Sequence, residues 1–122
     1  MLRRILRSLT TNVARYDDDA ADPRLHRPRV VTDIDHLIDR IRAWIGKQSR
    51  WDIESINRDV EPPTMHIIRR TRLLGFVDDV RLTMHDVDGV LVVDGVSQSR
   101  VGKGDLGQNA RNLIELRRAF AE

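Results

Sequence analysis

The sequence has no cysteine among its 122 residues. Disulfides, thiolate zinc sites and cysteine nucleophiles are therefore excluded for these residues. Aromatic residues make up only 4%, so the core must consist mainly of leucine, isoleucine and valine. The shortage of aromatic residues interleaved with basic ones also argues against a protein that stacks on nucleic acid. No apolar run approaches the roughly 20 residues that a membrane-spanning helix needs.

Metal and catalytic motifs are missing as well. The four histidines are dispersed without an i, i+4 pair, so we predict no metal site, and nothing indicates a cofactor. Asp78 and Asp79 are adjacent, and successive strand residues point to opposite faces, so they cannot act together as an acid/base dyad. Ser97 and Ser99 have no recognisable base. We therefore assign no catalytic residue.

Composition indicates a globular protein. Hydrophobic residues make up 40% and charged residues 33%, and the length suits a single core. The formal net charge of +2 is too small to imply a nucleic-acid partner. We expect an N-terminal segment over residues 1–28 and one α+β domain over residues 29–122, with the oligomeric state left open.

The N-terminal segment has two parts. Met1–Val13 places its apolar residues on one helical face and its arginines largely on the other, and it lacks the apolar stretch of a signal peptide. A docked helix and a helix lying on an anionic membrane both fit this pattern. Tyr16–Pro28 carries an acidic triplet and two prolines, which predicts a solvated linker. We expect a cytoplasmic protein, with peripheral membrane contact through Met1–Val13 as an alternative.

Two amphipathic helices are predicted in the domain. Thr32–Ile45 has an apolar stripe at helical spacing, with Thr32 as its N-cap and Gly46 as a left-handed stop. The second helix runs from about Leu106 to Phe120, with Asp105 in a capping box.

Four strands lie between the helices. They are expected over Trp51–Asn57, Thr64–Leu73, Phe76–His85 and Val90–Ser99. Turn residues separate them, which favours an antiparallel meander. The predicted fold is an α+β two-layer sandwich, in which two helices pack on one face of a four-stranded sheet.

The last hairpin allows two registers. A four-residue loop pairs Arg81 with Asp94 and places Asp78 opposite Ser97, which gives one apolar and one charge-paired face. A two-residue Asp88–Gly89 loop instead sets Met84 against Val93. We expect the first register. It puts Asp78 on the core face with the two serines, and it sends Asp79 to the other face, within reach of Arg100.

The candidate site lies where the last strand meets the last helix, around the bend Arg100–Gly107. Gly102–Gly107 has the spacing GxGxxG, but no strand follows its helix, so a dinucleotide site is not indicated. The bend either holds a small anion or serves as a structural lock. The candidate ligand-binding residues are Asp78, Asp79, Ser97, Ser99, Arg100, Lys103, Asp105 and Asn109.

Two segments carry a family resemblance. Leu73–Val80 (LLGFVDDV) and Ser97–Asn109 (SQSRVGKGDLGQN) resemble the hallmark of the mostly bacterial domain-of-unknown-function family 1499. The matching positions are Phe76, Asp78, Asp79, Ser97, Ser99, Arg100, Gly102, Asp105, Gly107 and Asn109. The resemblance extends over about Leu25 to Phe120, although the cysteine-containing segment of many members is absent here. It implies no established activity.

The favoured function is a non-enzymatic module that binds a small anion or a protein partner. An enzyme acting on a small anionic substrate, with Asp78 as base, is the main rival. A peripheral membrane protein is the third possibility.

The membrane interpretation makes a simple prediction. If Met1–Val13 lies on an anionic surface, the protein should sediment with anionic vesicles at low salt and be released at high salt, because ions screen surface attraction. Absence of binding at low salt would exclude this role.

Overall fold

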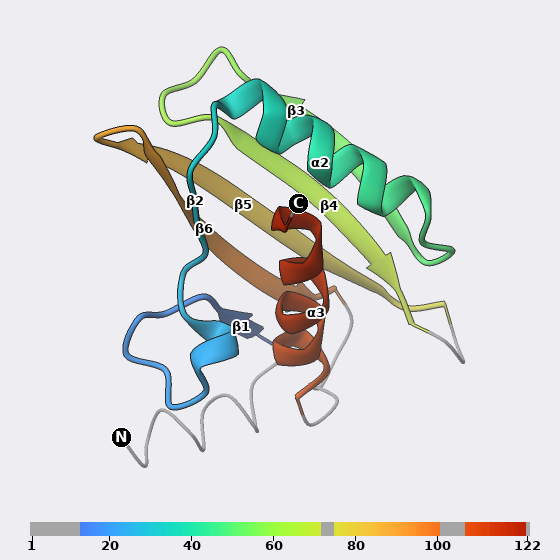
Figure 1. Cartoon of the computed structure of the whole chain (residues 1–122). Coiled ribbons are helices and arrows are strands. Elements are labelled where there is room, and N and C mark those ends of the chain that lie inside the picture. Colours follow the sequence, from blue (N-terminus) through green and yellow to red (C-terminus); the bar gives the residue numbers. More distant parts are fainter. Residues whose placement is uncertain (1–12, 72–74, 101–106, 122) are drawn as a thin grey trace.

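The computed structural model describes residues 13–71, 75–100 and 107–121. This part of the chain forms a six-stranded antiparallel sheet with two α-helices (Figure 1). The elements in chain order are β1 (Val13–Arg15), the 3-10 turn η1 (Pro23–Leu25), β2 (Arg29–Val30), α2 (Ile34–Gly46), β3 (Trp51–Asn57), β4 (Thr64–Arg70), β5 (Val77–Val87), β6 (Val90–Ser99), α3 (Gln108–Leu116) and the 3-10 turn η2 (Arg117–Phe120). The predicted α+β class is confirmed.

The sheet has two more strands than the four predicted. Its order is β1-β6-β5-β4-β3, and β2 also pairs with β6. β1 and β2 have three and two residues, too few to show an alternating pattern in the sequence. The predicted strands Trp51–Asn57 and Val90–Ser99 are confirmed, whereas the second ends at Arg70 and the third extends to Val87.

The expected register of the last hairpin is wrong. The loop is the two-residue Asp88–Gly89 turn, with φ of 53° and 85°, so both residues adopt the left-handed region that such turns require. Arg81 therefore lies opposite Val96 and not Asp94, and Asp78 lies opposite Ser99 and not Ser97. The observed register is shifted by two residues from the expected one. It preserves which side chains face inward, because strand side chains alternate with a period of two.

The helix caps differ from the prediction. Asp33, not Thr32, caps α2 by accepting a hydrogen bond from the His36 backbone nitrogen at 2.9 Å. Gly46 is the last residue of α2 and lacks a positive φ, so it is not a left-handed stop. α3 begins after Gly107, whose φ is 98°. The predicted Asp105 cap lies outside the described residues.

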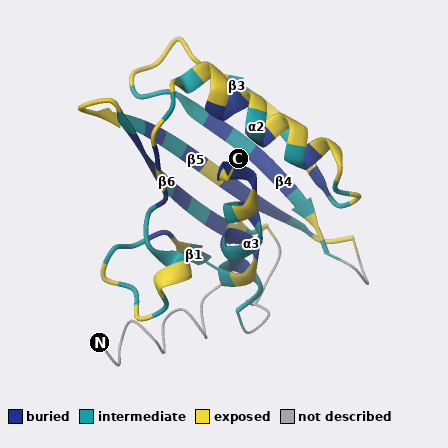
Figure 2. Ribbon diagram, in the orientation of Figure 1, coloured by how far each residue is buried: buried dark blue, intermediate teal, exposed yellow. Residues whose placement is uncertain are grey.

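Both helices lie over the same face of the sheet (Figure 1). Figure 2 shows buried residues along the strands beneath them. The apolar core includes Leu37, Ile38, Ile41, Ile45, Trp51, Met65, Ile67, Val80, Leu82, Met84, Leu91, Val93, Leu113, Leu116 and Phe120. Among the described residues, no helix is long and apolar enough to span a bilayer.

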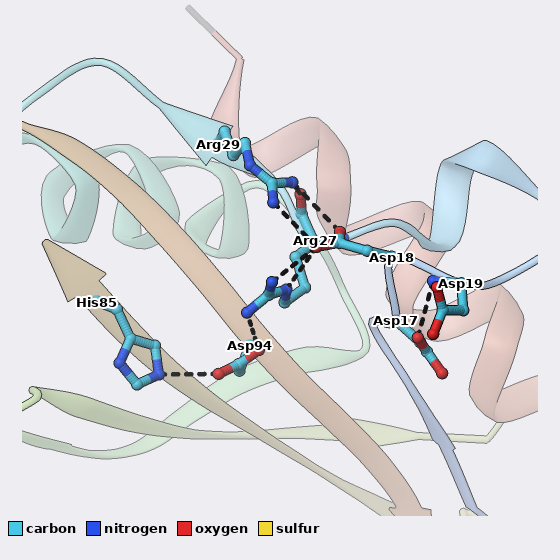
Figure 3. Close-up of polar contacts among 7 residues, drawn as sticks. All are labelled: Asp17, Asp18, Asp19, Arg27, Arg29, His85 and Asp94. Carbon is cyan, nitrogen blue, oxygen red and sulfur yellow. Dashed lines mark hydrogen bonds and ion pairs between the residues drawn. The ribbon is translucent and has the colours of Figure 1, made fainter. Parts of the chain in front are cut away.

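Most of Tyr16–Pro28 is at least partly exposed, and backbone hydrogen bonds attach both of its ends to β6. Tyr16 is only 4% exposed, and its hydroxyl donates to the Leu113 carbonyl at 2.6 Å. Burial raises the pKa of the Tyr16 phenol, so the group stays protonated and remains a donor. The Asp18 carboxylate accepts hydrogen bonds from Arg27 and Arg29 (Figure 3). Of Met1–Val13, only Val13 is described, as part of β1.

Gly95 is the described glycine at which an added β-carbon would meet the closest contacts. A β-carbon there would lie 2.6 Å from a Tyr16 ring carbon and 3.1 Å from Leu82, whereas one at Gly46 would meet nothing within 4 Å. Gly95→Ala should therefore lower the free energy of unfolding by about 1–3 kcal/mol, as overpacking does. Gly46→Ala is the matched control and should be neutral or stabilising by up to about 1 kcal/mol. Denaturant unfolding measures both, and equal stabilities would show that Tyr16 does not pack on Gly95.

Candidate functional site

The predicted site residues divide between the two faces of the sheet. Asp78, Ser97 and Ser99 have the same strand parity as the core residues Val80 and Val93, and face the helices. Asp79 and Arg100 meet on the opposite face. Asn109, from α3, joins the first group, while Lys103 and Asp105 lie outside the described residues. The described candidates thus form two clusters.

The helix-facing group forms what we call the inner network, comprising Asp78, Ser97, Ser99, Asn109 and Asn112. The Asn112 side-chain amide donates to Asp78 Oδ2 at 2.8 Å and to Ser97 Oγ at 3.2 Å. Ser97 Oγ donates to Asn109 Oδ1 at 2.8 Å, and Asn109 Nδ2 donates to Ser99 Oγ at 3.0 Å. Buried polar groups require such partners. The network therefore fixes α3 on the strands β5 and β6.

Asn112 is fully buried and was missed from the sequence. It lies on the same helical face as Asn109, Leu113 and Leu116, all of them buried. Two asparagines on the apolar face of one helix could have indicated a buried polar cluster, because a buried amide needs hydrogen-bond partners. Gln108 Nε2 completes the arrangement by donating to Asn112 Oδ1 at 2.8 Å.

On the opposite face, Asp79 is held between two donors. Arg100 donates to both Asp79 oxygens at 2.9 Å, and His66 Nε2 lies 2.6 Å from Oδ1. Asp79 thus lies on the face predicted for it and within reach of Arg100, which the sequence had left open as an anion partner or an internal counter-ion. The hydrogen bond from Arg100, reinforced by His66, lowers the pKa of Asp79 from 3.8 to about 2. Arg100 acts as an internal counter-ion in this arrangement.

A further residue of the helix-facing side, Arg69, was also missed. It stands in one row across the sheet with Trp51, Asp78 and Ser99, its successive cross-strand partners. Its side chain is only 15% exposed, yet it makes no hydrogen bond to any described residue, and its Nε is fully buried without a partner. Buried donors in proteins are normally satisfied. Among the described residues, Arg69 is therefore an exception to this rule, because its buried Nε has no hydrogen-bond partner.

The groups around Arg69 are held in position by others. Glu115 Oε2 is 3.9 Å from the Arg69 guanidinium, while Glu115 Oε1 accepts a hydrogen bond from Trp51 Nε1 at 3.1 Å. The guanidinium carbon lies 5.9 Å from the centre of the Trp51 ring, at cation–π distance. Trp44 packs edge-on against Trp51 at 5.4 Å. A cation, an acceptor and an aromatic wall therefore adjoin one another.

Across the described ranges, no three histidine or acidic side chains are close enough together to hold a metal ion.

Together the fold and these clusters define a small α+β protein whose last helix is joined to its sheet through buried polar side chains. The chain belongs to the family described as a protein of unknown function (DUF1499), whose profile matches residues 6–120. The resemblance seen in the sequence is thereby confirmed, and the match extends nearer the N-terminus than the residues that suggested it. No curated protein and no solved structure matches the chain.

Removing the Arg100 side chain should change how Asp79 titrates. In Arg100→Ala the pKa of Asp79 should rise from about 2 toward 3.8, because its main donor is lost. The native carboxylate has a lowered pKa, so its contribution to stability is present above about pH 4 and disappears as the pH falls through about 2. Wild type should therefore be more stable than the variant at neutral pH, and the difference should vanish in strong acid.

NMR titration of the Asp79 carboxyl carbon and denaturant unfolding across pH measure these effects. Arg81→Ala is the control, because Arg81 is exposed on the same face and forms no ion pair with a described residue. An equal pKa change in both variants would contradict a specific role for Arg100.

Proposed function

We propose that this protein is a non-enzymatic module that binds a small molecule through an anionic group, with Arg69 as the cation. The observation that carries the proposal is the Arg69 Nε–H, which is buried without a hydrogen-bond partner among the described residues, on a side chain that is 15% exposed. Removing such a group from water is costly unless its donors are satisfied. A carboxylate or phosphate on the ligand would satisfy them, since the guanidinium fork matches the geometry of both.

The surroundings of Arg69 constrain the ligand further. Asp78 is the cross-strand neighbour of Arg69, and Glu115 is the nearest carboxylate on α3. Two carboxylates beside one guanidinium would repel a ligand that carries negative charge alone. The ligand therefore also carries a hydrogen-bond donor for Glu115, whose side chain is 34% exposed. A hydrogen phosphate or a carboxylate bearing an amine or hydroxyl meets both requirements.

The inner network supports binding without catalysis. The Ser97 hydroxyl donates to the amide oxygen of Asn109, and not to a group that would activate it as a nucleophile. Asp78 is only 1% exposed and accepts a hydrogen bond from Asn112, so a substrate has little access to it as a base. In this proposal Asp78, Ser97, Ser99 and Asn109 position α3, and hence Glu115, beside Arg69. Direct ligand contacts by Lys103 and Asp105 stay predictions.

Replacing Arg69 by methionine should separate binding from stability. Without ligand, Arg69→Met should unfold within about 1 kcal/mol of wild type, because an apolar side chain replaces a largely buried cation whose Nε donor is unsatisfied. Phosphate should raise the melting temperature of wild type by mass action and leave that of Arg69→Met unchanged. Thermal unfolding in phosphate and in chloride at equal ionic strength measures both effects.

The matched control is Arg70→Met. Arg70 points to the opposite face and pairs with Asp52, so this variant should keep the full phosphate response. Sulfate, which has no donor at neutral pH, should stabilise wild type less than phosphate does. A phosphate response of equal size in wild type and Arg69→Met would refute the proposed site.

A further inference from the structure

A separate groove lies between β2, α2 and η2. Its volume is about 470 Å³, within the usual range of small-molecule sites. Arg29, Arg40 and Arg117 line it, and none of its lining residues in the described part of the chain is acidic. The apolar lining includes Val30 and Phe120, which are buried, and Val31, which is 81% exposed. The groove thus combines cationic groups with apolar surface.

Backbone carbonyl oxygens accept hydrogen bonds from two of the three arginines. Arg117 Nη1 donates to the carbonyls of His26 at 2.6 Å and Arg24 at 3.1 Å. Arg40 Nη1 donates to the carbonyl of Phe120 at 3.2 Å. The two carbonyl oxygens orient the Arg117 guanidinium without cancelling its charge. Within the described ranges, no carboxylate pairs with Arg117.

Arg29 is positioned differently. It donates to both oxygens of Asp18, at 3.2 and 2.9 Å, and the same carboxylate accepts from Arg27 (Figure 3). These hydrogen bonds, first from Arg29 and then from Arg27, keep the pKa of Asp18 well below its ordinary value. One carboxylate is thus shared by two guanidiniums, so the charge of Arg29 is only partly balanced by Asp18.

We infer that this groove binds a carboxylate carrying a short apolar chain. The carboxylate pairs with Arg117, whose held orientation leaves donors for a charge-assisted hydrogen bond. The chain lies against Val31 and Phe120 and removes the exposed valine from water. The inference is independent of Arg69, because none of the groove's lining residues belongs to the Arg69 site.

The test is an NMR titration of the full chain with sodium octanoate, with sodium acetate as the ligand that lacks the chain. Octanoate should bind saturably and shift the amide signals of Val31 and Phe120, whereas acetate should bind at least about tenfold more weakly. The substitution Arg117→Gln should weaken the binding of octanoate by about tenfold. Arg118→Gln is the matched control, because Arg118 is exposed and does not line the groove. The substitution Val31→Ser should weaken the binding of octanoate and leave the binding of acetate unchanged.

The variants must give native-like spectra. If Arg117→Gln does not fold, Arg29→Gln serves in its place and should also weaken octanoate. Octanoate binding that fails to saturate, or that is equal in Arg117→Gln and Arg118→Gln, would overturn the inference. Binding to anionic vesicles without binding to free octanoate would overturn it in favour of a membrane surface.

Discussion

The rest of the structure depends on how one buried carboxylate is satisfied. Asp78 is 1% exposed on the helix-covered face, where an unpaired charge would be strongly destabilising. The Asn112 side-chain amide, on α3, donates hydrogen bonds to Asp78 and to Ser97. Ser97 in turn donates to Asn109, which also lies on α3. This arrangement sets the position of α3. This position of α3 places Glu115 beside Arg69 and Leu113 in the apolar core.

The adjacent aspartates Asp78 and Asp79 point to opposite faces of the sheet and therefore have different partners. Asp78 faces α3, while Asp79 faces away and is held by Arg100 and His66. The described polar residues that suggested the family are thus joined by hydrogen bonds within the protein. Their internal pairing explains why they occur together without requiring that they perform chemistry. Arg69, whose buried Nε has no hydrogen-bond partner among the described residues, lies outside that set.

Much of the fold was predictable from apolar periodicity, which located α2 and the longer strands correctly. The hairpin register was missed because the charge pairing of Arg81 with Asp94 was given more weight than the residue pair Asp88–Gly89, which is typical of the two-residue left-handed turn that the structure has. Arg69 was hidden because Ile67 and Ile68 are both apolar, so the inward face of β4 could not be identified from alternation. The pairing of Asp79 with Arg100 was predictable, since it needed only the parity of two strands.

The hydrogen bond from Tyr16 to Leu113 has a consequence for biosynthesis. It joins residues 97 positions apart, so Tyr16, which directly follows β1, can meet its partner on α3 only after the residues between them have been made. At ordinary translation speeds the two groups are synthesised roughly 5–20 s apart. During that interval the Tyr16 hydroxyl lacks its carbonyl acceptor on α3, so the segment around Tyr16 is not yet held to the helix.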